Sequence, residues 1–134
     1  MSARILRGAC RCGRVEYEVD DEFTYAVNCH CRDCQRATGS AFKPFAGIAQ
    51  SKLRLTKGAA DTSIYGDAAE NHDMLCRHCG SLLYSVILPD RVHVTLGTLV
   101  DAPAIRPTHH IFVASKAPWH EIDDSLPQYA GHKP

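Results

Sequence analysis

Seven cysteines in three closely spaced groups are the residues of this chain best suited to chemistry. They occur as Cys10-x-Cys12, as Cys29-x-Cys31-x-x-Cys34 and as Cys76-x-x-Cys79, which is followed by Gly80. Residues two apart in an extended chain point to the same side, so a C-x-C pair can direct both sulfurs at one metal ion. A C-x-x-C turn does the same by folding back, and a glycine after it permits the tight backbone. The spacing predicts metal binding.

The seven thiols divide most simply into a group of four and a group of three. The two pairs give four ligands and a closed tetrahedral site, which is typical of structural zinc. The triplet leaves one position for water or an external ligand, which is typical of catalytic zinc. We therefore expect two zinc ions per chain. The structural ion is expected on Cys10, Cys12, Cys76 and Cys79, and the catalytic ion on Cys29, Cys31 and Cys34.

Other arrangements of these ligands remain open on the residues alone. The triplet could take Cys76 or Cys79 as its fourth ligand, and His30, His78 or Asp33 could complete a site. Buried free cysteines are the plainest alternative, because a free thiol packs as a small hydrophobic group. Seven cysteines in spaced groups argue against that, and an odd number fits poorly with a closed set of disulfides.

Composition narrows the class of protein that carries these cysteines. The chain has 134 residues, 45% apolar and 22% charged, which suits a single domain over 1–134 with a hydrophobic core. Lysine plus arginine equals aspartate plus glutamate at 15 each, which argues against nucleic acid or an anionic membrane as a partner. The start MSARILRGACRCG lacks the apolar core of a signal peptide, and no run spans a bilayer. We expect a cytoplasmic protein with reduced thiols.

Apolar residues recur mostly with a period of two, which predicts β-strands. We expect strands over 14–19, 52–56, 81–86, 91–100 and 109–114, with glycines near strand ends or bulges. One helical turn is expected over 31–38, where Gly39 would end it. The segment 101–110 and the chain after Pro118 are expected to be surface coil. The predicted fold class is therefore all-β, with one short helix beside the cysteine triplet.

Three aromatic residues and one histidine are further candidates near the expected site. Trp119 is the only tryptophan, and we expect it in the core or at a sheet edge. Phe42 and Phe45 are expected to pack under the cysteine triplet. His30 lies between two of the triplet's cysteines, which places it at the rim of the expected catalytic site. An imidazole there could shuttle a proton.

The cysteine groups and the C-terminal segment together resemble the glutathione-dependent formaldehyde-activating enzyme (GFA) family, which includes centromere protein V. The matching motifs are C-x-C near the start, C-H-C-x-x-C-Q-[KR]-x-x-G-[ST] over 29–40, C-x-x-C-G-[ST] over 76–81, and the ending HHIFVASKAPWHEIDDSLPQYAG over 109–131. The motifs run from about Gly8 to Gly131, nearly the whole chain.

The resemblance implies a zinc-bearing β-tent fold of packed antiparallel sheets. It implies the same structural and catalytic ligand sets, with the thiol of glutathione at the open zinc position. The implied activity is that of a carbon–sulfur lyase: glutathione, or another small thiol, adds to formaldehyde or a similar small aldehyde, and the reverse reaction cleaves the adduct. Residues 65–76 lack an arginine that many members carry before the second C-x-x-C. We therefore expect weaker glutathione binding, with a smaller thiol as competitor.

Two other classes of function compete with this interpretation. One is a non-catalytic, zinc-stabilised β domain that binds a thiol ligand or a protein partner, since a fold can persist without its activity. The other is a nucleic-acid-binding zinc ribbon, which the neutral net charge disfavours. An open zinc position separates the enzyme from the ribbon, and turnover separates it from the binding domain.

Overall fold

The computed structural model describes residues 4–134, which form mostly β-strands with one short α-helix. The strands are β1 (Ile5–Ala9), β2 (Glu16–Asp20), β3 (Tyr25–Cys29), β4 (Lys43–Ala49), β5 (Leu53–Lys57), β6 (Thr62–Tyr65), β7 (His72–Cys76), β8 (Leu82–Ile87), β9 (Arg91–Thr95) and β10 (His110–Ile111). The helices are α1 (Arg32–Thr38) and the short 3₁₀ segments η1 (Gln50–Lys52), η2 (Ala59–Asp61), η3 (Leu96–Thr98) and η4 (Val113–Ser115). This content confirms the predicted fold class.

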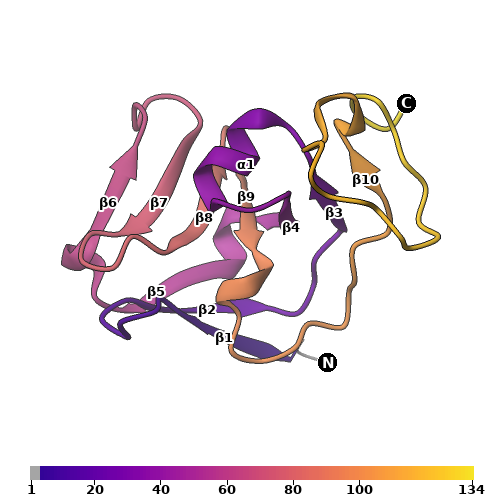
Figure 1. Ribbon diagram of the computed structural model, residues 1–134. Helices are drawn as coiled ribbons and strands as arrows, with labels where there is room; N and C mark the ends of the chain where they lie inside the picture. Colours follow the sequence, from indigo (N-terminus) through magenta and orange to yellow (C-terminus); the bar gives the residue numbers. More distant parts are fainter. Residues whose placement is uncertain (1–3) are drawn as a thin grey trace.

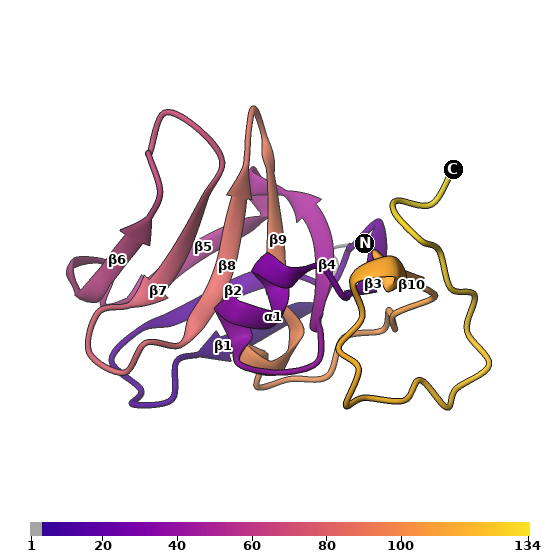
Figure 2. The same cartoon turned by 45° about the horizontal axis from the view of Figure 1, so that its top comes forward.

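The strands form two sheets that lie one above the other (Figure 1). The smaller sheet has the order β1-β2-β5, and the larger has the order β10-β3-β4-β9-β8-β7-β6. Neighbouring strands are antiparallel except for β10 and β3, which run parallel. Figure 2 shows α1 beside β8, β9 and β4, and the C-terminal segment beyond β10. Within residues 4–134, no helix has the length and apolarity needed to cross a membrane.

The larger sheet buries one face and leaves the other partly open. On β9, Val92 and Val94 are fully buried and join a core with Leu6 and Val19 of the smaller sheet. His93 lies between these two valines and points to the opposite face, because side chains alternate along a strand. The main core therefore lies between the sheets, and the other face of the larger sheet is available for a site.

The sequence predicted the helix well, but the five predicted strands correspond only to β2, β5, β8, β9 and β10, and β1, β3, β4, β6 and β7 were not predicted. Helix α1 follows Cys31 and ends at Gly39, whose φ of 64° is the left-handed conformation that glycine favours at a helix end. The strand predicted over 91–100 stops at Thr95, where a 3₁₀ segment begins. The strand predicted over 109–114 is only two residues long, because Phe112 has a positive φ of 55° and turns the chain.

Gly47 lies within β4, although glycines were expected near strand ends or bulges. It is directly opposite Tyr25, and a Cβ atom placed on it would lie 2.1 Å from Cζ of the Tyr25 ring. The ring therefore crosses the glycine, and its hydroxyl reaches Nε2 of His93 at 2.6 Å. The missing side chain at this position allows that hydrogen bond.

Replacing Gly47 with alanine should displace the Tyr25 ring and break its hydrogen bond to His93. Steric insertion of this kind costs about 1–3 kcal/mol of unfolding free energy, which urea denaturation would measure. Gly97→Ala is the matched control, because no atom lies within 4 Å of a Cβ placed there. Equal stability of the two variants would mean that the ring relaxes freely.

Candidate metal centres and the adjoining cleft

A group of four cysteines joins the turn after β1 to the turn after β7. The Sγ atoms of Cys10, Cys12, Cys76 and Cys79 all lie within 4.8 Å of one another. Cys12 Sγ lies 3.6 Å from that of Cys10 and 3.7 Å from that of Cys76. Zinc–sulfur bonds of about 2.3 Å in a tetrahedron separate the sulfurs by about 3.8 Å, whereas a disulfide needs about 2.05 Å. The four-cysteine group therefore has the spacing of a zinc site.

Backbone and hydroxyl groups hold the sulfurs of this group in place. The N–H of Val15 donates to Cys10 Sγ at 3.3 Å, and the N–H of Cys79 donates to Cys76 Sγ at 3.5 Å. The Ser81 hydroxyl lies 3.3 Å from Cys79 Sγ, and this contact lowers the pKa of Cys79 to about 5. Such donors stabilise thiolate, which is the form that binds metal. The group therefore ties the smaller sheet to the larger one.

The three-cysteine group lies where β3 passes into α1. The Sγ atoms of Cys29, Cys31 and Cys34 lie within 4.8 Å of one another, and no histidine or carboxylate of residues 4–134 joins them. Cys31 caps the helix, since its Sγ accepts the backbone N–H of Cys34 at 3.3 Å. The first turn of α1 is therefore also the turn that brings Cys31 and Cys34 together. Of the alternative ligands, His78 instead contacts Asp61, with 2.6 Å between Nε2 and Oδ1.

The thiols of the three-cysteine group differ in how readily they ionise. A hydrogen bond from Cys34, more than any other contact, lowers the pKa of Cys29 to about 6, and the Lys43 ammonium acts in the same direction. The pKa of Cys34 is raised, first by its hydrogen bond to Cys29 and then by burial. Cys29 is thus the thiol of this group that ionises most readily, and thiolate is the form that binds metal.

A cleft of about 800 Å³ adjoins the three-cysteine group. Cys29 and Cys34 line it, and so do Phe45, Ser85 and His93 from the open face of the larger sheet. Its volume falls within the range of about 300–1,000 Å³ that is usual for small-molecule sites. No member of the four-cysteine group lines this cleft. The two groups thus differ in access as well as in ligand number.

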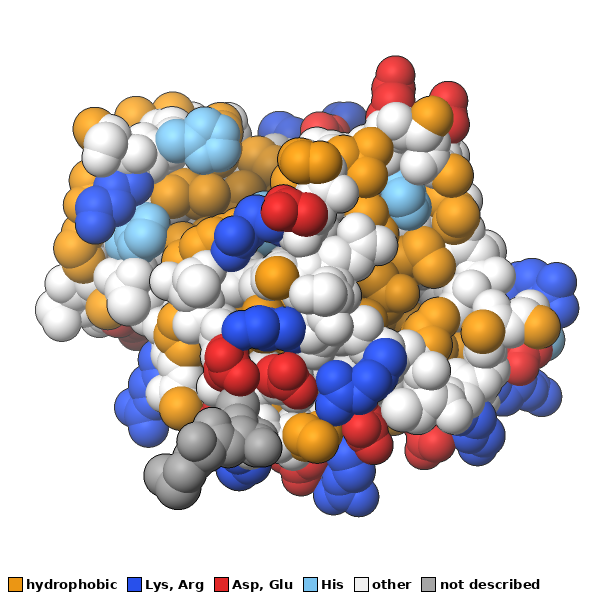
Figure 3. All heavy atoms as spheres, turned by 180° about the vertical axis from the view of Figure 1, so that it is seen from behind, with side chains coloured by type: hydrophobic (Ala, Val, Ile, Leu, Met, Phe, Trp, Pro, Cys, Tyr) orange, Lys and Arg blue, Asp and Glu red, His pale blue; other side chains and the backbone are white. Residues whose placement is uncertain are grey.

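Charged side chains gather on the smaller sheet instead. Arg54 contacts Glu18 and Asp20 at 3.3 Å each, and Lys52 contacts Glu22 at 2.7 Å. Seen from behind, both signs of charge mix along the lower part of the molecule (Figure 3). The upper part is hollowed and shows hydrophobic and histidine side chains beside a few charged ones. Arg54 and Lys52 are therefore both matched by acidic groups.

Comparison with known proteins identifies the family. The sequence profile of the glutathione-dependent formaldehyde-activating enzymes matches residues 5–115. The chain belongs to this family. A Halomonas elongata protein that is provisionally named as such an enzyme is 27% identical over 129 residues, which cover 89% of this chain and 82% of that protein. The crystal structure of a Rhodobacter sphaeroides protein, also 27% identical, has a TM-score of 0.60 and covers 73% of this chain and 91% of the other.

Two histidines and one aspartate of the GFA motifs form one hydrogen-bonded chain. His30 Nε2 lies 2.8 Å from His110 Nδ1, and His110 Nε2 lies 2.9 Å from Oδ2 of Asp124. The Asp124 carboxylate accepts the hydrogen on His110 Nε2, which leaves His110 Nδ1 to meet Nε2 of His30. Burial lowers the pKa of His30 to about 4. The chain of contacts fastens the C-terminal segment to the loop between β3 and α1.

The prediction that His30 lies at the rim of the expected catalytic site is wrong. Its side chain is fully buried, because alternation along the extended chain turns it away from the side to which Cys29 and Cys31 point. The Phe42 ring packs against the His30 ring, with the two ring centres 5.0 Å apart. Phe42 therefore lies on the side of His30 and not under the triplet, where it was predicted. Phe45 does lie under the triplet, in a small apolar cluster with Cys29.

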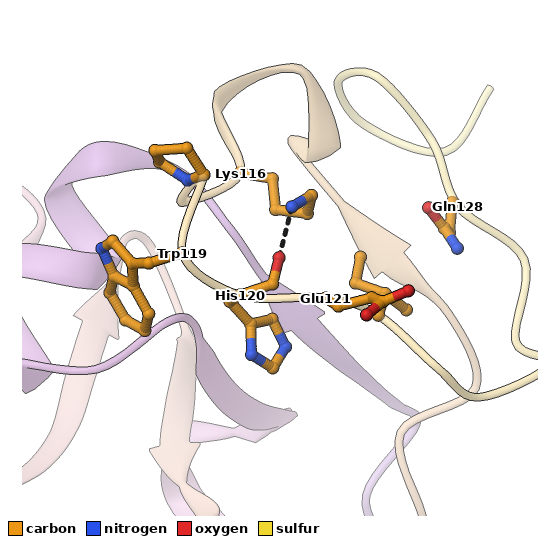
Figure 4. Close-up of a pocket in the computed structure, with 7 residues that line it drawn as sticks. Lys116, Trp119, His120, Glu121 and Gln128 are labelled. Atoms are coloured by element: carbon orange, nitrogen blue, oxygen red, sulfur yellow. Dashed lines mark hydrogen bonds between the residues drawn. The ribbon is translucent and has the colours of Figure 1, made fainter.

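The tryptophan prediction is also wrong. Trp119 is 71% exposed and lines a second hollow, of about 530 Å³, in the C-terminal segment. Figure 4 shows its ring projecting from a loop that also carries Lys116 and His120, with the Lys116 ammonium bonded to the His120 carbonyl. The residue follows Pro118 in irregular chain, so no strand directs its ring into the core.

Several polar residues of the cleft were not predicted as site residues, and four of them lie on adjacent strands. These four are Lys43, Asp73, Ser85 and His93. Their strands are adjacent in the order β4, β9, β8, β7, and Ser85 lies directly opposite both His93 and Asp73. Only the strand order brings these residues together, and nothing in their local spacing marks them.

Removing the Asp124 carboxylate should loosen the C-terminal segment. In the Asp124→Ala variant, the Tyr129 amide, which donates to the His110 carbonyl at 2.9 Å, should exchange with deuterium on the order of tenfold faster. Asp123→Ala, at an exposed neighbour, is the control. The His110 contact lowers the pKa of Asp124. The protection in the native protein should therefore persist at neutral pH and disappear only as the pH falls through that lowered value. Unchanged exchange at Tyr129 would exclude this anchoring role.

Proposed function

We propose that this protein is a zinc-dependent enzyme of the carbon–sulfur lyase type. It adds glutathione, or another small thiol, to formaldehyde or a similar small aldehyde, and it cleaves such adducts in reverse. One observation carries this proposal: Cys29 and Cys34 of the three-cysteine group line a cleft of about 800 Å³, and no member of the four-cysteine group does. The GFA family name supplies the substrates. The cytoplasm suits both the thiol substrate and seven free cysteines.

We assign a structural zinc to Cys10, Cys12, Cys76 and Cys79 and a catalytic zinc to Cys29, Cys31 and Cys34. The spacing of both sets of sulfurs fits this metal. Bound by three thiolates, zinc supplies an open coordination position that lowers the pKa of a substrate thiol. The four-cysteine group holds the two sheets together and so fixes the cleft floor. Residues 1–134 act as one domain in this proposal.

The protein residues around the triplet give the reacting groups a sheltered space. Phe45 and Ile111 pack against the three-cysteine group and line the cleft. Their apolar side chains exclude water from the thiolate, which strengthens electrostatic interactions there. The exposed Tyr65 and the partly buried His72 also line the cleft, on strands β6 and β7, where a larger thiol such as a tripeptide can extend.

The two metal centres should respond differently to loss of one ligand. Cys76→Ser should yield no folded protein, because a structural zinc contributes about 10–16 kcal/mol to folding, comparable to the whole stability of a domain, about 5–15 kcal/mol. Cys31→Ser should keep the fold and one zinc. Elemental analysis and thermal denaturation would check this. A folded Cys76→Ser variant together with an unfolded Cys31→Ser variant would mean that the roles are exchanged, and equal melting temperatures would mean that the two centres do not differ in role.

The open position should bind a thiol directly. In cobalt-substituted protein, glutathione should change the thiolate-to-metal absorption and release a proton, because thiolate is the coordinating form. Affinity should rise with pH until the free thiol ionises. Cys34→Ser should abolish the change. If no thiol alters the spectrum and formaldehyde is consumed no faster with protein, the non-catalytic binding domain becomes the better account.

A further inference from the structure

Lys43 is a buried cation that the reaction described above leaves without a role. Only 6% of its surface is exposed, yet its side chain lines the cleft together with Cys29 and Cys34. Burying an ammonium costs free energy unless it is paired. Some interaction must therefore compensate the charge of the Lys43 ammonium at the cleft.

The register of the larger sheet places Lys43 on the same face as the three-cysteine group. Lys43 on β4 lies directly opposite Cys29 on β3, and opposite residues of an antiparallel pair share a face. Phe45, two residues further along β4, also points to this face. It packs against the triplet, and Lys43 Nζ lies 5.6 Å from the centre of its ring. The ammonium and the thiols therefore flank the same aromatic ring.

Two further side chains hold the ammonium in place. Nζ donates to Ser85 Oγ at 2.9 Å, and the Ser85 hydroxyl donates its single hydrogen to Oδ1 of Asp73 at 2.6 Å. Asp73 thus compensates the charge of Lys43 through an intervening hydroxyl. In the described part of the chain, Ser85 is the one hydrogen-bond partner of Nζ. An ammonium has three hydrogens, so two remain for an acceptor in the cleft.

We propose that Lys43 is a catalytic residue, whose ammonium donates a hydrogen bond to the aldehyde oxygen while the thiol adds to the carbonyl carbon. The inference rests on the proposed function. A sulfur lone pair forms the carbon–sulfur bond, and the carbonyl π pair moves onto oxygen, where the ammonium stabilises the new negative charge. Solvent then gives the oxygen one proton, which balances the proton that the thiol lost. Cleavage of the adduct follows the same steps in reverse.

Lys43→Met tests this role in turnover. The variant should keep two zinc ions and a KM for glutathione within about threefold, while kcat falls about 10²–10³-fold, the usual loss for one oxyanion donor. Exchange NMR between free and thiol-bound formaldehyde measures the rate. Lys52→Met is the matched control, because Lys52 pairs with Glu22 beside the smaller sheet and does not line the cleft. Methylammonium should partly restore the activity of Lys43→Ala, which a purely structural loss would not allow.

A binding measurement tests the same contact without turnover. Mercaptoacetate carries an oxygen anion near its sulfur, and ethanethiol is of similar size without one. The cobalt protein should bind mercaptoacetate at least about tenfold more tightly, as expected of a hydrogen bond between charged groups. Lys43→Met should abolish this preference, and Lys52→Met should preserve it.

Each other outcome overturns the inference in a recognisable way. Turnover of Lys43→Met equal to that of the unmodified protein removes Lys43 from the reaction and leaves the proposed function standing. Loss of one zinc from Lys43→Met would make the lysine a counter-charge for the metal site. A raised KM with unchanged kcat would make it an anchor for a substrate carboxylate. An unmodified protein that turns over no thiol and aldehyde pair overturns the proposed function and this role together.

Discussion

Alternation of side chains across the larger sheet is the constraint on which the rest of the molecule depends. Val92 and Val94 of β9 point into the core between the sheets, and His93 points to the cleft. A slip of one residue would exchange the two faces. Each buried valine or leucine side chain stabilises the fold by about 1.5–3 kcal/mol. The apolar core face therefore fixes where the polar residues of the cleft lie.

The same alternation distinguishes two cysteine groups of similar chemistry. Between β3 and α1 it directs Cys29 and Cys31 to one side and His30 to the other, where His30 meets the C-terminal segment. The four-cysteine group instead lies in turns at the ends of strands from both sheets, where its geometry can hold the sheets together. Ligand number and environment agree: the group with three thiols is the one that adjoins the cleft.

Local features were predicted and long-range ones were not. The cysteine groups and helix α1 were predictable because ligand spacing and a helix-ending glycine act over a few residues. Strands β3 and β4 were missed because β3 is buried on both faces and β4 carries Lys43 and Gly47 where apolar residues would mark a strand. The contact between His30 and His110 joins residues 80 positions apart, so no local pattern could reveal it.

The polar residues of the cleft gain their properties from this rigid sheet. Because Gly47 has no side chain, the Tyr25 ring can reach His93, which also stacks on Phe45 with ring centres 4.3 Å apart. Burial, aided by the charge of Lys43, lowers the pKa of His93 to about 4, so the imidazole is neutral at neutral pH. Lys43 therefore provides the positive charge on the sheet face that lines the cleft, and its hydrogen bond to Ser85 holds the ammonium in place. A fixed cation in a partly dry cleft needs no reorganisation when charge forms on a substrate oxygen, which makes it more effective than water at stabilising that charge.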